Sequence, residues 1–229
     1  MTPPALAEDI LCNVAWNTQS LGRNCEYGFI QRQCKAEPIS LLRWSGMPTT
    51  GLIDALACDF AGLMDSATGA GVPLRVPYEE RKWWLTCGRF ELVAHTADNV
   101  VQFTVEQAAE RIRGRLRLLA RKLMEDIRGG EKIFVYSSAD FTRAADARPL
   151  IAAVRDCGGH GRLIIVGGGA DEKLRQIDDA VWWARLPRLT RMMAATGADV
   201  PAWMGLLADI AVAIPEAAVA PYDGGAARL

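Results

Sequence analysis

Residues 20–28 read Ser-Leu-Gly-Arg-Asn-Cys-Glu-Tyr-Gly. The sequence of residues 12–19, before this stretch, is typical of a short inner strand, and the residues after it have the composition of a helix. The sequence therefore predicts a strand, a turn that contains glycine, and a helix over about 25–35. Asn24 is a favourable N-cap residue, which would place Cys25 in the first turn of that helix.

A cysteine at a helix start can be a reactive thiol. Backbone N–H groups there lack helical partners and carry partial positive charge. They stabilise a thiolate and lower its pKa, so Cys25 is a candidate nucleophile. The alternative is a structural Cys25 beside an ordinary capped helix, because free cysteines are often small buried apolar side chains. Spacing alone favours that alternative.

The composition indicates a globular protein whose cysteines are reduced thiols. The chain has 229 residues, half of them hydrophobic, and a net charge of −1, which argues against disorder and against strong attraction to polyanions. No apolar run is long enough to cross a membrane, and 1–9 has no features of a secretory signal, so we expect a cytoplasmic protein. The six cysteines form no close pairs, so neither disulfides nor a zinc site is expected.

The order of the expected elements indicates an α/β fold. Strands alternate with helices, and the short apolar strands 133–136 and 163–166 favour a sheet covered on both faces. We expect one three-layer α/β domain over 1–229, with a mostly parallel or mixed sheet, an antiparallel hairpin near 82–95, and a frayed tail from about 215. Further strands are expected over 39–44 and 181–186, further helices from 48, after Thr104, over 147–156 and over 201–214, and loops over 66–77 and 96–99.

Two patterns suggest functions that the surrounding residues disfavour. The glycine run 167–169 follows a strand, but it lacks the G-x-G-x-x-G spacing and is followed by acidic residues, so no nucleotide cofactor is expected. The arginines and lysine of 111–122 make a helix look basic. With net charge near zero and no interleaved aromatic residues, a solvated face is favoured over nucleic acid binding.

Any mechanism that needs an imidazole must use His95 or His160, because the chain has no other histidine. His160 lies in a glycine-rich turn and is expected to be exposed. His95 is expected to end a strand and to open a polar loop that holds Asp98. A ring there could act as a base while a carboxylate orients it, either Asp98 or Asp140, which follows the strand 133–136.

The pattern Ser-Leu-Gly-x-Asn-Cys over 20–25 resembles the signature of a bacterial family described as papain-like cysteine peptidases of unknown function. The resemblance covers roughly 14–140 and is most specific in its first third, where it continues through 29–32, 36–38 and 41–44. It implies that Cys25 is the nucleophile and His95 the base. Members of the family commonly have Asp directly after this His, whereas Thr96 stands here, so the third catalytic residue stays open.

The resemblance also bears on the oxyanion and on the fold. Gln19 is similar in position to the glutamine that papain-like enzymes use to bind an oxyanion, six residues before the nucleophile. In papain-like folds the helix that bears the cysteine follows a loop and packs against a separate β-rich half of the protein. The strand expected before Cys25 instead favours an open sheet with the nucleophile after its first strand.

These observations give two hypotheses of function. The first is a cysteine hydrolase or acyltransferase that acts on an amide, ester or thioester of a small molecule, peptide or glycan. Asn24, Arg43 and Trp44 would bind substrate, with Trp44 or the pair 83–84 on the wall of the cleft. Arg43 is expected to lie beside the Cys25 helix and to position a carboxylate. The second is a non-catalytic module that binds a glycan or a protein, in which Cys25 is structural. The oligomeric state is left open.

Overall fold

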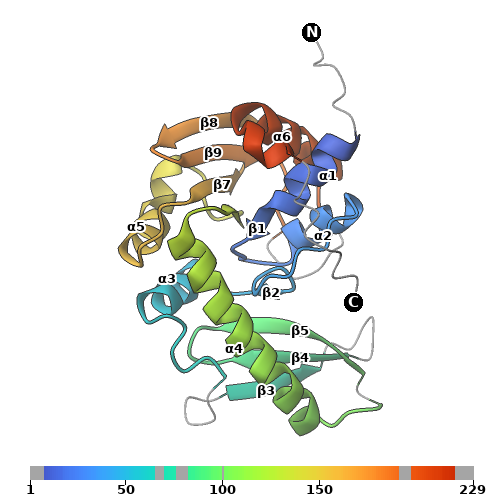
Figure 1. The fold of residues 1–229 in the computed structure, drawn as a ribbon. Coiled ribbons are helices and arrows are strands. Elements are labelled where there is room, and N and C mark those ends of the chain that lie inside the picture. The colour runs from blue at the N-terminus through green and yellow to red at the C-terminus, as the bar shows by residue number, and fades with distance from the viewer. Residues whose placement is uncertain (1–7, 65–69, 76–81, 100, 191–196, 220–229) are drawn as a thin grey trace.

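The computed structural model describes residues 8–64, 70–75, 82–99, 101–190 and 197–219, the side chains of 70–75, 82–83, 96–99 and 105 excepted. These segments form two sheets with helices around them, as Figure 1 shows.

The larger sheet is mixed and mostly parallel. Its strand order is β1-β6-β7-β9-β8, in which the first four strands are parallel and β8 runs antiparallel to β9. The strands are β1 (Thr18–Ser20), β6 (Ile133–Ser138), β7 (Arg162–Gly168), β8 (Glu172–Asp178) and β9 (Val181–Leu186). The expected α/β class is confirmed, with the nucleophile candidate following the first strand of an open sheet.

Both faces of this sheet are covered, which gives three layers. Side chains alternate across a strand, so Ile133 and Val135 of β6 lie on one face and Phe134 and Tyr136 on the other. The first pair packs with α1 (Glu8–Asn17), α2 (Glu26–Gln33) and α6 (Val200–Ala213). The second pair packs with α3 (Thr49–Ala57), α4 (Val105–Gly129) and α5 (Arg148–Asp156). This double cover is what the all-apolar strands predicted.

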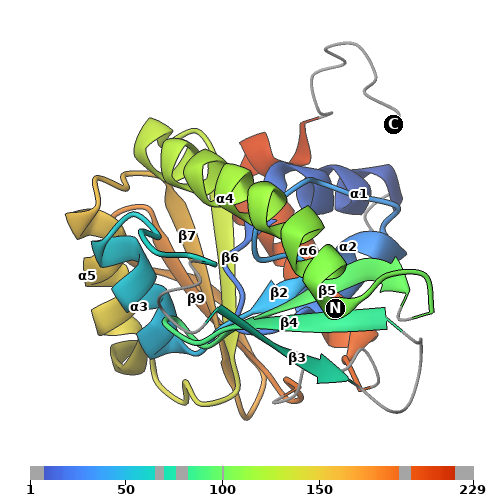
Figure 2. The same ribbon diagram turned by 90° about the horizontal axis from the view of Figure 1, so that it is seen from below.

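The smaller sheet is antiparallel and has the order β2-β5-β4-β3. Its strands are β2 (Ser45–Gly46), β3 (Ala70–Arg75), β4 (Lys82–Cys87) and β5 (Leu92–Asn99). The predicted hairpin is therefore present as β4 and β5, but within a sheet that the sequence did not indicate. Buried residues of α4 share one core with both sheets, and Figure 2 shows α4 running from one sheet to the other.

The helix expected after Thr104 is α4, and it begins with a capping box formed by Thr104 and Gln107. The same helix ends at Gly130, whose φ of 71° is left-handed and suits glycine. The helices expected from 48, over 147–156 and over 201–214 are α3, α5 and α6.

The strand predicted over 12–19 is wrong for most of its length. Residues up to Asn17 are the helix α1, and only Thr18–Ser20 is extended. Tertiary contacts explain the helix, because Val14 and Ala15 are fully buried in the core shared with α6. The Asn17 side chain also donates hydrogen bonds to the carbonyl oxygens of Ala217 and Val219. Ala217 is fully buried in a short 3-10 helix, Pro215–Ala218, so the predicted fraying from 215 is wrong for those residues.

Four further differences concern extended segments. The strand predicted over 39–44 is irregular, with turns and bends over 41–44, and the paired strand β2 is only Ser45–Gly46. The loop predicted over 66–77 contains β3, and the loop predicted over 96–99 is the end of β5. Strand β8 was not predicted, because its residues are mostly charged or polar. Such residues are typical of the exposed edge strand that β8 is.

Candidate active site

Cys25 lies where β1 gives way to α2. Its carbonyl oxygen accepts a hydrogen bond from Phe29 N at 3.1 Å, and it occupies the N-cap position of α2. Asn24 therefore precedes the cap, one residue earlier than predicted. Its side-chain oxygen accepts from Glu26 N at 3.0 Å and closes the turn. The thiol stands at the positive end of a helix, as the sequence indicated.

The two neighbours of Cys25 are both anchored to Thr190. The Asn24 side-chain amide donates to Thr190 O at 2.7 Å. The buried carboxylate of Glu26 accepts from Thr190 N at 2.8 Å and from Trp203 Nε1 at 3.0 Å. These bonds engage the Asn24 side chain within the protein, whereas the sequence had suggested it as a substrate-binding group. The anchor was missed because nothing in the sequence links Glu26 to partners more than 160 residues away.

His95 is held from two sides within the smaller sheet. Its backbone N–H donates to the carbonyl oxygen of Trp44 at 3.0 Å. Its cross-strand neighbour in β4 is Trp84, whose ring stacks on the imidazole with centroids 3.9 Å apart and planes 27° apart. The stacked indole limits how far the imidazole can rotate, so both the backbone and the ring of His95 are positioned.

The structure brings Cys25 and His95 together. Cys25 Sγ lies 3.8 Å from His95 Nδ1, although the residues are 70 positions apart and Cys25 follows a strand of the larger sheet whereas His95 lies in the smaller one. The thiol can donate to a neutral Nδ1, or a protonated Nδ1 can donate to the sulfur. Either arrangement allows a proton to pass between the two groups.

The Cys25 thiol is nonetheless protonated in this state. Only 1 % of the residue is exposed, and this burial raises the pKa of the thiol to about 12. The sequence had predicted a lowered pKa from the helix start alone. Burial has the opposite effect to that expectation, because the loss of hydration disfavours the charged thiolate.

The candidate third residues are not joined to His95 by any hydrogen bond that the described side chains show. Asp140 follows β6, is half exposed and forms an ion pair with Arg23. The side chain of Asp98 lies outside the described part of the chain. Gln19 is buried in β1 opposite Phe134, and within the described residues no hydrogen bond joins its side chain to Cys25. The orienting group and the oxyanion role of Gln19 remain predictions.

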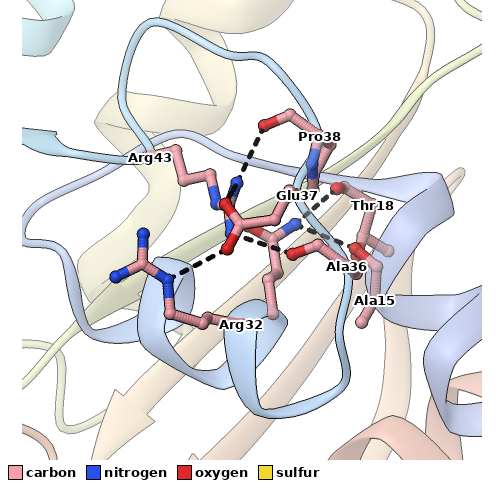
Figure 3. A network of polar contacts seen from close by, with 8 residues as sticks. Ala15, Thr18, Arg32, Ala36, Glu37, Pro38 and Arg43 are labelled. Carbon is pink, nitrogen blue, oxygen red and sulfur yellow. Dashed lines mark hydrogen bonds and ion pairs between the residues drawn. The ribbon is translucent and has the colours of Figure 1, made fainter. Parts of the chain in front are cut away.

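Arg43 belongs to a polar network beside α2, drawn in Figure 3. Its guanidinium is buried, donates to the carbonyl oxygens of Ala36 and Pro38 at 2.8 and 3.4 Å, and pairs with Glu37. Arg32 of α2 binds the same carboxylate at 2.9 Å. Arg43 therefore lies beside the Cys25 helix and positions a carboxylate of the protein, as predicted. These contacts serve the fold, and its suggested contact with substrate remains a prediction.

Trp44 extends this network toward the site. The Arg32 and Arg43 guanidinium carbons lie 4.3 and 4.8 Å from the Trp44 ring centroid, and the Phe29 ring meets it edge-on at 5.1 Å. These contacts fix the ring against α2. Its carbonyl oxygen meanwhile holds His95. Trp44 thus links the two elements that carry the candidate dyad.

Two hollows that the described residues outline lie away from the Cys25–His95 pair. One hollow of about 250 Å³ lies between residues 59–63 and the 117–128 part of α4. A second is lined by residues 103–111, and neither Cys25 nor His95 lines either of them. Cys25 itself is almost completely buried, whereas His95 is partly exposed.

Comparisons of the chain with protein-family models, with curated proteins and with solved structures find no match. The resemblance to papain-like peptidases therefore remains a prediction from the sequence. Within the described residues, no three His, Cys, Asp or Glu side chains are grouped so that they could hold a metal ion. No helix in that part of the chain combines the length and apolar character of a membrane span.

Proposed function

We propose that the chain is a cysteine-dependent hydrolase or acyltransferase, in which Cys25 is the nucleophile and His95 the base. The observation that carries this proposal is the 3.8 Å separation of Cys25 Sγ and His95 Nδ1. A thiol beside an imidazole at the start of a helix is a combination that covalent catalysis needs.

Because the thiol is buried, Cys25 starts the reaction with its proton in place and must transfer it to His95. Because the pKa of Cys25 is about 12, the resting group is S–H and not a preformed thiolate. The proton passes from Sγ to Nδ1 as Sγ bonds to the carbonyl carbon of the substrate. Nδ1–H then protonates the leaving amine, alcohol or thiol as its bond to that carbon breaks, leaving an acyl-thioester on Cys25. Water completes hydrolysis, and another nucleophile completes transfer, with His95 again accepting the proton.

Two features of the site would stabilise the charges that develop in this step, which are negative on the substrate oxygen and positive on the imidazole of His95. The backbone N–H of Cys25 would donate to the developing oxyanion, and a well-placed donor of this kind contributes ~3 kcal/mol. Gln19 is the further donor that the sequence suggests. The stacked Trp84 ring presents its π face to the imidazole, and an imidazolium gains about 0.5–2 kcal/mol from such a contact.

The alternative function is a non-catalytic module for a glycan or a protein, with a structural Cys25. The observation that favours it is the near-complete burial of the thiol. The two functions differ in whether an electrophile can reach Cys25 with help from His95. A small set of acylating and alkylating probes, read by intact mass and peptide mapping, separates them.

The proposal predicts adducts on Cys25 in the wild type, no such adducts in Cys25→Ala, and slower formation in His95→Ala, by ~10²-fold for the loss of a general base. His160→Ala is the matched control and is expected to react like the wild type. Fast adducts that survive Cys25→Ala, or equal rates in His95→Ala and the wild type, would contradict the dyad and favour the binding module.

A further inference from the structure

Cys25 stands at the start of α2 and His95 in β5 of the smaller sheet, so some part of the chain must set their separation. Cys25 is fixed by α2, and His95 by β5. The segment 36–46, which follows α2 and enters the smaller sheet as β2, contacts both α2 and β5. The inference below rests on the proposed function and concerns which residues hold its two reacting groups at the right distance.

The contact with α2 is made at Gly28, three residues after Cys25. A Cβ atom at Gly28 would lie 2.4 Å from the carbonyl oxygen of Arg43 and 3.0 Å from its Cγ. Ordinary contacts of a Cβ begin near 3.4 Å. The first turn of α2 and the backbone of residue 43 are thus in direct contact, and only a glycine permits it.

The side chain of Arg43 keeps its backbone in this place. Its donors hold the Ala36 and Pro38 carbonyl oxygens and the Glu37 carboxylate, and Glu37 is tied in turn to Arg32 of α2 (Figure 3). The buried guanidinium therefore fastens both ends of the loop 36–43 to the Cys25 helix.

The contact with His95 is made one residue later. Trp44 O accepts from His95 N at 3.0 Å, and the pairing continues with Ser45 opposite Ala94. One peptide unit thus separates the atom that rests on the Cys25 helix from the atom that holds the His95 backbone. A displacement of the backbone at residue 43 would therefore move Trp44 O, and with it the backbone of His95.

We propose that residues 43–44 are the spacer that sets the distance between Cys25 Sγ and His95 Nδ1, with Gly28 and Arg43 as positioning residues. Neither residue takes part in the chemistry. Substitution of Gly28 by alanine moves the spacer by about 1 Å, the shortfall from ordinary contact. A misplacement of that size in a reacting pair costs up to about a hundredfold in rate.

The pH profile of Cys25 alkylation by chloroacetamide, read by peptide mapping, tests this assignment. A thiol that His95 serves as base reacts at a rate that levels off once the imidazole is neutral. A lone buried thiol instead reacts about tenfold faster with each pH unit, as its thiolate fraction rises. His95→Ala supplies the lone-thiol profile directly.

We expect Gly28→Ala to lose the plateau and to adopt the profile of His95→Ala, with a rate about tenfold or more below the wild type at pH 7.5. Gly114→Ala is the matched control, because a Cβ at that position of α4 meets nothing within 4 Å. It should keep the wild-type profile. A Gly28→Ala protein that retains the plateau and the rate would overturn the spacer while leaving the dyad in place.

A second variant and the wild-type profile distinguish failure of the spacer from failure of the proposed function. If Gly28→Ala does not fold, Glu37→Gln serves in its place, since its side chain is half exposed and its loss weakens the hold on Arg43 and Arg32. It should lower the plateau rate about threefold, from partial loosening of the pair, and an unchanged rate would count against the spacer. If the wild type itself shows the lone-thiol profile, the proposed function fails, and the spacer fails with it.

Discussion

At the scale of single residues, the site depends on a thiol that is well placed and poorly ionised. Sequence reasoning identified both partners, because a cysteine at a helix start and one of only two histidines are rare enough to stand out. It was wrong about the state of the thiol. Burial depends on what the other elements bring over Cys25, and no local pattern around residues 20–28 carries that information.

The orienting carboxylate gives a prediction at the same scale. Asp140 is already engaged by Arg23, so Asp140→Asn is expected to change the rate of Cys25 acylation by about twofold or less. Asp98→Asn should slow it by ~10-fold or more if Asp98 orients His95, because the imidazole then loses the partner that stabilises its charged form. Rates measured with the same electrophile would contradict this choice if the two effects were reversed.

At the scale of elements, two buried side chains connect α2 to the rest of the molecule: Glu26 within the helix and Arg43 beside it. The sequence predicted the helix and the position of Arg43 beside it. It could not predict the Thr190 anchor or the carbonyl groups that Arg43 binds, since both depend on how distant or irregular segments fold back. The same limit explains why the pattern of 12–17 predicts a strand, whereas the core that these residues share with α6 makes them a helix.

The Glu26 anchor yields a stability prediction. Glu26→Gln should lower the free energy of unfolding by about 2–4 kcal/mol, because one carboxylate oxygen that faces N–H donors becomes an N–H group in a buried site. Urea unfolding followed by tryptophan fluorescence measures this loss. Glu110→Gln is the matched control, since that side chain is three-quarters exposed, and it should change stability by no more than about 0.5 kcal/mol.

Glu37 yields a prediction about pH. Partial burial by itself would raise the pKa of Glu37, but hydrogen bonds and positive charge from Arg43 and Arg32 hold it below its usual value. A carboxylate with a lowered folded pKa stabilises the fold above its unfolded pKa of about 4.3, and this contribution is lost as pH falls through the folded pKa.

The free energy of unfolding should therefore differ most between the wild type and Glu37→Gln near neutral pH, and the difference should shrink below about pH 4. Glu131→Gln removes the same charge from an exposed position and serves as the control. Urea unfolding at pH 7, 5 and 3 measures both differences. A difference for Glu37→Gln that stays constant over this range would show that its carboxylate gains nothing from the two arginines.

At the scale of the whole molecule, the two sheets meet at the candidate site. The sequence predicted the open sheet, because its apolar strands can be recognised one by one. It did not predict the second sheet, because β2 has two residues and β3 lies in a run rich in glycine and proline. The resulting arrangement has a cysteine after the first strand of an open sheet and a histidine on a separate antiparallel one.

The contact between Cys25 and His95 is the central claim, and the ring nitrogens of the two histidines report on it directly. In protein labelled with ¹⁵N-histidine, His160→Gln assigns the signals. The contact predicts that Cys25→Ala shifts the Nδ1 signal of His95 while leaving those of His160 in place, and that Cys25→Ser, which keeps a donor, shifts it less. A His95 signal that is the same in Cys25→Ala as in the wild type would contradict the contact and the dyad proposed from it.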